Sequence, residues 1–242
     1  MRIQYVLHAD FELPGRIEQW AARRGHAQAR CKPFRGERLP DVSEFDLLVV
    51  MGGPQSAREL GAAPYLAREI ELIAGALRQD LPVLGICLGA QLLGEACGAR
   101  TERSPEREIG FFPIDLTEAG RTDPVLRGLP PRFVVAHWHG DMPGLAPGCA
   151  VLATSAGCPR QIVRYAPKAY GFQCHPEFTA ECVGLMLQHG AADLAPGPYV
   201  QSAERMRAED LSDMHARADA MLGHFLSNAA DVSARPDCVS PA

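Results

Sequence analysis

Hydrophobic positions in the first third of the chain alternate between continuous runs and stripes with helical spacing. Residues 46–51 and 83–86 are continuous apolar runs, as expected of strands buried on both faces of a parallel sheet. Apolar residues between positions 66 and 77 recur at spacings of four, three and four, which predicts a helix. Residues 16–24 predict an earlier helix, and residues 27–31 a second strand.

The middle of the chain changes character, because short strand-like runs follow one another through Gly- and Pro-containing loops. We predict strands over residues 108–117, 133–139, 151–155, 161–165 and 170–175. Helical patterns return over residues 179–189 and 203–228. The whole pattern predicts an α/β fold with a doubly wound, mostly parallel central sheet flanked by helices. A smaller region of mixed or antiparallel strands accompanies that sheet.

The length of 242 residues suits one large domain or two small ones. We expect residues 1–190 to form one domain and residues 191–230 to form a C-terminal helical extension packed on it. Residues 231–242 read as a flexible tail.

Composition narrows the range of partners. With 24 Lys and Arg against 29 Asp and Glu, the formal charge is −5, so no basic excess favours nucleic acid or an anionic membrane. No apolar stretch approaches the roughly 18–20 residues of a membrane helix, and the N-terminal apolar run is too short for a secretory signal. We therefore expect a cytoplasmic protein that acts on a small molecule.

The eight cysteines do not form a disulfide or zinc pattern, because they are scattered singly without a C-x-x-C pair. One of them, Cys87, stands in a special context, where Gly85 and Gly89 flank it after the buried run 83–86. A nucleophile at a tight strand-to-helix corner needs small residues on both sides, as in the G-x-S-x-G elbow. The helix N-terminus that follows also favours a thiolate. On this motif alone, an ordinary buried cysteine is as well supported as a catalytic one.

A second motif, Gly171-Phe-Gln-Cys-His-Pro-Glu177, favours the catalytic interpretation. A thiolate nucleophile needs an imidazole to exchange its proton, and the imidazole needs a carboxylate to orient it. His175 and Glu177 supply both groups. Because they are two residues apart, they project to the same side if the backbone is extended, and Pro176 favours that conformation at His175.

These residues resemble the class I (triad) glutamine amidotransferases. The resemblance is carried, in the family's order, by residues 51–56 (Met-Gly-Gly-Pro-Gln-Ser), the Gly85-x-Cys87-x-Gly89-x-Gln91 motif and His175-Pro-Glu177. Residues 137–141 (His-Trp-His-Gly-Asp) add a narrower likeness to proteins related to the glutaminase half of GMP synthase. The resemblance implies a flavodoxin-like class I amidotransferase fold in residues 1–190.

The resemblance also implies a mechanism and its residues. Cys87 would attack the side-chain amide of glutamine, His175 would protonate the departing ammonia, and Glu177 would orient His175. Water would then hydrolyse the γ-glutamyl thioester. The backbone N–H groups of Gly53 and Leu88 would hold the oxyanion. The family positions that contact the substrate correspond to Gly52, Gln91, Trp138 and His139.

Other polar residues have weaker assignments. His137, His139 and Asp141 have strand-like spacing, and no further ligand of metal type lies near them in the sequence, so we predict neither a metal nor a cofactor. We predict that Arg160 and Arg164 are solvated residues of a strand. The alternative is that one of them binds a carboxylate.

Three functions remain open from the sequence. The first is glutamine hydrolysis, with the ammonia passed to a synthetase partner that the sequence does not identify. The second is a γ-glutamyl peptidase that acts on glutathione-like compounds through the same thioester, motivated by a length that leaves no room for a synthetase half. The third is a partner-dependent or non-catalytic regulatory subunit. The oligomeric state is open as well.

Overall fold

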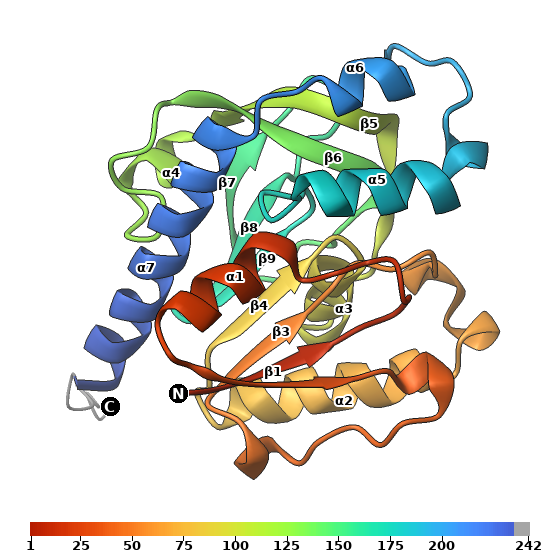
Figure 1. Cartoon of the computed structure of the whole chain (residues 1–242). Helices are drawn as coiled ribbons and strands as arrows, with labels where there is room; N and C mark the ends of the chain where they lie inside the picture. Colours follow the sequence, from red (N-terminus) through yellow and green to blue (C-terminus); the bar gives the residue numbers. More distant parts are fainter. Residues whose placement is uncertain (235–242) are drawn as a thin grey trace.

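A single ten-stranded sheet organises the computed structural model, which describes residues 1–234 (Figure 1). The strand order is β10-β5-β7-β8-β9-β4-β3-β1-β2, and β6 pairs with β5. The strands are β1 (Arg2–Val6), β2 (Ala27–Cys31), β3 (Leu47–Val50), β4 (Val83–Ile86), β5 (Glu102–Leu116), β6 (Arg132–Met142), β7 (Ala150–Thr154), β8 (Ile162–Ala166), β9 (Ala169–Phe172) and β10 (Tyr199–Val200).

The sheet has a parallel half and a mainly antiparallel half. Strands β2, β1, β3, β4 and β9 are parallel neighbours. From β9 onward, β8, β7, β5 and β6 pair antiparallel, while β10 adds to β5 in parallel. The predicted fold class is confirmed, and the structure adds that the antiparallel strands continue the central sheet. The physical reason is that β9 pairs on one edge with β4 and on the other with β8.

Helices cover both faces of the sheet (Figure 1). They are α1 (Gly15–Arg23), α2 (Tyr65–Arg78), α3 (Leu88–Ala96), α4 (Glu118–Thr122), α5 (Ala180–His189), α6 (Ala203–Arg207) and α7 (Ser212–Ala234). Alternate residues of one strand point to opposite faces. Tyr5 accordingly packs in the core with α1, α5 and α7, whereas its neighbour Val6 packs with α2 and α3. This double covering explains the continuous apolar runs in the parallel strands.

The C-terminal region packs against the sheet domain. Arg16 and Arg23 of α1 both contact the Asp219 carboxylate of α7, at 2.8 and 2.9 Å. The predicted helix over residues 203–228 is two helices, α6 and α7, separated by residues 208–211. Helix α7 also runs four residues into the predicted tail, because its alanine-rich sequence keeps a helical pattern. The rest of that tail, residues 235–242, lies outside the described residues.

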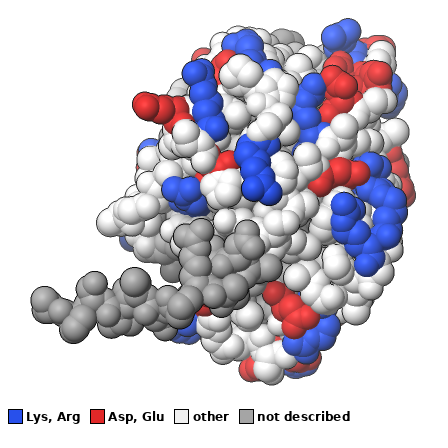
Figure 2. All heavy atoms as spheres, turned by 90° about the vertical axis from the view of Figure 1, so that its left-hand side faces the viewer, with Lys and Arg blue, Asp and Glu red and all other residues white. Residues whose placement is uncertain are grey.

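Charges are mixed on the face of the molecule drawn in Figure 2, where Lys and Arg side chains stand among Asp and Glu. The described residues on that face therefore form no continuous basic surface for a polyanion. Within the described part of the chain, no helix is long and apolar enough to cross a membrane.

Candidate active site

Cys87 occupies the predicted corner between β4 and α3. Its backbone is strained, with φ of 51° and ψ of −108°. The chain crowds on both sides: a Cβ on Gly85 would lie 2.4 Å from the carbonyl oxygen of Gly89, and a Cβ on Gly89 would lie 2.0 Å from that of Val50. Only glycine fits at either position, so the flanking glycines of the motif are explained by close backbone approach.

His175 and Glu177 meet as their spacing predicts. The Nδ1 atom of His175 lies 2.7 Å from Oε1 of Glu177, and both side chains are almost fully buried. Burial alone would lower the pKa of His175, but the charge of Glu177 and the neighbouring Cys87 thiol raise it well above its usual value. The backbone N–H of His175 donates to the Ala136 carbonyl at 2.8 Å, which ties the backbone of His175 to β6.

A cavity of about 390 Å³ connects the predicted residues. Six of the nine predicted site residues line it: Gly53, Cys87, Gln91, Trp138, His139 and His175. The other three, Gly52, Leu88 and Glu177, do not line the cavity. Each is hydrogen-bonded to, or in contact with, a residue that does. Arg103, Arg107, His189 and Asp193 also line the cavity.

The two predicted oxyanion donors lie on adjacent segments. A Cβ on Gly53 would lie 2.9 Å from Cδ2 of Leu88, which begins α3. The first N–H groups of a helix have no intrahelical partner, so the Leu88 N–H is available. No acceptor within residues 1–234 takes the Gly53 N–H.

The predicted substrate contacts form a chain of side chains around the thiol. Gln91 donates through Nε2 to Oε1 of Gln173 at 3.1 Å, and Gln173 donates through Nε2 to the Cys87 sulfur at 3.4 Å. The Cys87 thiol also lies 3.7 Å from the carbonyl oxygen of Trp138. The Trp138 indole N–H donates to Asp193 at 3.0 Å, which holds the ring at the cavity wall.

The sequence interpretation missed two residues of this site. Gln173 could have been found, because it lies two residues before His175 and therefore points to the same side of an extended segment. Glu12 carries no motif, and its only signal is its place after a parallel strand, where α/β proteins form their sites. Burial raises the pKa of Glu12 to about 7, although the nearby His175 and His8 lower it.

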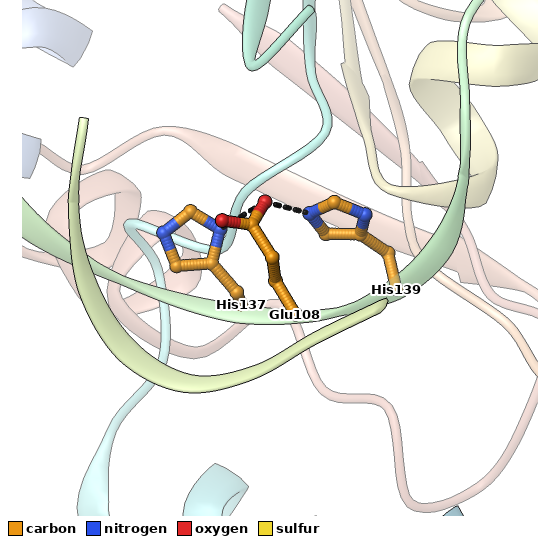
Figure 3. Close-up of side chains that lie close together, drawn as sticks. All are labelled: Glu108, His137 and His139. Carbon is orange, nitrogen blue, oxygen red and sulfur yellow. Dashed lines mark ion pairs between the residues drawn. The ribbon is translucent and has the colours of Figure 1, made fainter. Parts of the chain in front are cut away.

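Glu108, His137 and His139 cluster beside the cavity, with the carboxylate between the two rings (Figure 3). Oε2 of Glu108 lies 3.4 Å from Nε2 of His139 and 3.8 Å from Nδ1 of His137. The same oxygen accepts hydrogen bonds from Ser155 at 2.8 Å and from Gln161 at 2.6 Å. These donors satisfy the carboxylate without an ion, although the donor set is of a metal-binding type. Burial lowers the pKa of His137 to about 3, so its ring is neutral.

Arg160 and Arg164 bind carboxylates of the protein itself. Arg160 contacts Glu102 at 2.7 Å, and Arg164 contacts the buried Asp123 at 2.6 Å. Neither arginine lines the cavity beside Cys87. Each of the two arginines is therefore paired with a carboxylate of the chain.

Comparison with known proteins agrees with this geometry. Residues 21–187 match the family model for class-I glutamine amidotransferases. The chain is 45% identical over 224 residues to the glutamine amidotransferase-like protein YfeJ of Salmonella typhimurium, covering 90% of this chain and 94% of that protein. The crystal structure of SMU.1228c is 44% identical with a TM-score of 0.89, covering 93% of this chain and 100% of that one.

The chain also has a more distant match, to a GMP synthase. It is 33% identical over 162 residues to the glutamine-hydrolysing GMP synthase of Thermosipho melanesiensis, covering 63% of this chain and 29% of the synthase. This protein belongs to the class I glutamine amidotransferase family. Within that family it is YfeJ-like and related to the glutaminase domain of GMP synthase.

Proposed function

We propose that this class I glutamine amidotransferase-like protein hydrolyses the side-chain amide of glutamine with Cys87 as its nucleophile. The observation that carries the proposal is the arrangement of three side chains. Cys87 and His175 line one cavity, and Glu177 holds the far nitrogen of the imidazole at 2.7 Å. A nucleophile, a base and an orienting carboxylate in this relation are the minimal set for acyl transfer.

In the first half-reaction the Cys87 thiolate attacks the amide carbon of the substrate side chain. The carbonyl oxygen becomes an oxyanion, which the N–H groups of Gly53 and Leu88 stabilise. When the C–N bond breaks, the His175 imidazolium gives its proton to the leaving nitrogen, and ammonia departs. The product on the enzyme is a γ-glutamyl thioester.

In the second half-reaction His175 takes a proton from water, and the hydroxide attacks the thioester carbon. The C–S bond breaks, which releases glutamate and restores Cys87. Glu177 holds the imidazole with Nε2 facing the reacting atoms in both steps. Gln91, Trp138 and His139, which line the cavity, would contact the glutamyl part of the substrate, with Gly52 directly behind the cavity wall. An ammonia-accepting synthetase would be the partner.

Replacing the nucleophile tests this proposal directly. We expect Cys87→Ala to abolish glutamate release from glutamine and to prevent the mass increase of one γ-glutamyl group on the intact protein. Cys97→Ala is the matched control, since Cys97 caps the other end of the same helix, away from the cavity. Glutamate release that survives in Cys87→Ala would disprove the role of Cys87.

A second candidate, hydrolysis of γ-glutamyl peptides, is favoured by the extent of the cavity. Beyond the thiol it reaches Arg103 and Arg107, whose guanidinium groups are suited to a carboxylate on the leaving amino acid. The same thioester would form, and an amino acid or peptide would leave in place of ammonia.

Substrate comparison separates the two candidates. If γ-glutamyl peptides are the substrates, kcat/KM for a γ-glutamyl dipeptide exceeds that for glutamine. Arg103→Gln and Arg107→Gln then lower only the dipeptide value. A higher kcat/KM for glutamine, or equal losses with both substrates, would contradict the peptidase assignment.

A further inference from the structure

A second buried His–Glu pair lies beneath the active site. Nε2 of His8 is 2.6 Å from Oε2 of Glu69, and Nδ1 of His8 is 3.0 Å from the carbonyl oxygen of Gly52. His8 follows β1, Glu69 lies on α2, and each is about 1% exposed. The reaction described above does not use this pair.

The partners of His8 fix where its protons lie. A carbonyl oxygen can only accept, so Nδ1 of His8 carries a proton and donates it to Gly52. One more proton lies between Nε2 and the Glu69 carboxylate. Burial alone would lower the pKa of His8, but Glu69 and the Gly52 carbonyl raise it above its usual value. Glu69 therefore orients His8 as Glu177 orients His175.

His8 donates its Nδ1 hydrogen bond to the peptide unit that contains the proposed oxyanion donor, the Gly53 N–H. The carbonyl of Gly52 and the N–H of Gly53 belong to the same amide group. A hydrogen bond accepted by the oxygen of an amide polarises the group and makes its N–H a stronger donor. His8 thus acts on the Gly53 N–H through one conjugated unit.

Packing couples His8 to Gly53 as well. A Cβ on Gly53 would lie 2.5 Å from Cβ of His8, so the two residues are in direct contact. Gln55 donates through Nε2 to the His8 carbonyl oxygen at 3.0 Å, which ties the following turn to the same residue. The position and the orientation of the Gly52–Gly53 peptide therefore both depend on His8.

Stabilisation of the fold is a weak explanation for the burial of His8 and Glu69 as a pair. Burying two ionisable groups costs desolvation energy that their attraction often only balances. The second carboxylate oxygen of Glu69, Oε1, is buried and has no hydrogen-bond partner within the described residues. An apolar pair of similar volume would avoid that cost, so the position of the pair under the turn calls for a functional reason.

We propose that His8, oriented by Glu69, is a positioning residue that holds and polarises the Gly52–Gly53 peptide as an oxyanion donor. This inference rests on the proposed function, because it concerns the oxyanion of the same acyl transfer. It assigns to His8 and Glu69 a role in the rate of acylation, without contact to the substrate.

Two reactions of the same thiol test the inference. Acylation by glutamine, or by a γ-glutamyl dipeptide, passes through an oxyanion. Alkylation by iodoacetamide forms the S–C bond as iodide leaves and needs no oxyanion. We expect His8→Leu to lower kcat for acylation about 10- to 100-fold, with KM and the alkylation rate of Cys87 within about 3-fold of wild type.

Two conservative variants complete the design. His8→Asn keeps an N–H donor near the position of Nδ1, so it should restore kcat to within about 10-fold of wild type. If His8→Leu does not fold, Glu69→Gln serves in its place, since it keeps the shape and removes the charge. It should lower kcat about 3- to 10-fold, without changing the alkylation rate.

The outcomes separate this inference from the proposed function. Unchanged acylation in both His8→Leu and Glu69→Gln would overturn the inference and leave the proposed function intact. Acylation and alkylation that fall together would also overturn it, since the pair would then only support the structure. A wild-type protein that neither glutamine nor a γ-glutamyl dipeptide acylates would overturn both.

Discussion

The strained backbone at Cys87 predicts an unusual response to substitution. At φ 51° and ψ −108°, an L-residue with a Cβ occupies a sparsely populated region. Such a conformation typically costs about 1–3 kcal/mol, which the surrounding structure must supply. Alanine at position 87 keeps the Cβ and the strain, whereas glycine removes both. Cys87→Gly should therefore be more stable than Cys87→Ala, the reverse of the usual order.

The magnitude follows from two opposing terms. Relief of strain favours glycine by about 1–3 kcal/mol, and its greater freedom in the unfolded chain costs about 0.5–1 kcal/mol. The net advantage of Cys87→Gly over Cys87→Ala is therefore about 1 kcal/mol, within a range of about 0–2.5. Cys31 in β2 is a suitable control, because it is also buried and is not among the non-glycine residues with positive φ. There, glycine should be less stable than alanine by about 0.5–1 kcal/mol.

Urea unfolding of the four variants at 25 °C measures these differences. The difference in unfolding free energy between the glycine and alanine variants at position 31 is subtracted from the same difference at position 87. This cancels the intrinsic difference between glycine and alanine and leaves the strain energy at position 87, which we expect to be about 1–3 kcal/mol. A difference of zero, or of the opposite sign, would refute the claim that the corner stores strain. Both Cys87 variants should be inactive, so stability is compared without interference from turnover.

Three further predictions concern single residues. The unfolding free energy of Glu12→Gln should rise relative to that of wild type as pH increases from 5 to 8, by at most about 3 kcal/mol. The reason is that the pKa of Glu12 is about 7 in the folded protein, above its ordinary value, so wild type is destabilised as pH rises through that window. Parallel curves of unfolding free energy against pH for the two proteins would contradict this. Arg164→Gln should lower the unfolding free energy by about 1–2 kcal/mol, because it removes the ion-pair partner of the buried Asp123 carboxylate. Its kcat/KM should stay within about 2-fold of wild type, and unfolding and steady-state kinetics measure the two quantities. Gly89→Ala should cost about 3 kcal/mol or more through its backbone clash, whereas Gly184→Ala, in open helical space, should stabilise by up to about 1 kcal/mol, both read by urea unfolding.

The local elements and the His175–Glu177 pair could be predicted because their signals are short in sequence. Strands at residues 27–31 and 83–86 are confirmed to the residue, since each is a compact run with clear ends. The pairing of His175 with Glu177 followed from a spacing of two in an extended segment. In each case, the information lies within a few neighbouring positions.

Other features depend on contacts between distant segments. His8 and Glu69 are 61 positions apart, and each alone resembles an ordinary polar residue. The continuation of one sheet from parallel to antiparallel pairing depends on which edge of β9 receives β8, and no local pattern encodes that choice. The break between α6 and α7 was missed for another reason, because helix-forming composition continues across it.

Strand order explains how separate motifs become one site. In the parallel half, β9, β4, β3 and β1 are consecutive neighbours, so their carboxyl ends lie side by side at one edge of the sheet. The segments that follow these four strands carry His175, Cys87, Gly53 and His8, in that spatial order. The proposed nucleophile, Cys87, thus lies between its proposed base and the proposed oxyanion donor. That donor in turn lies between Cys87 and His8, the residue proposed to polarise it. Exchanging any two of these strands would keep every motif intact and destroy the site. The order of strands is therefore as much a part of the proposed active site as the residues themselves.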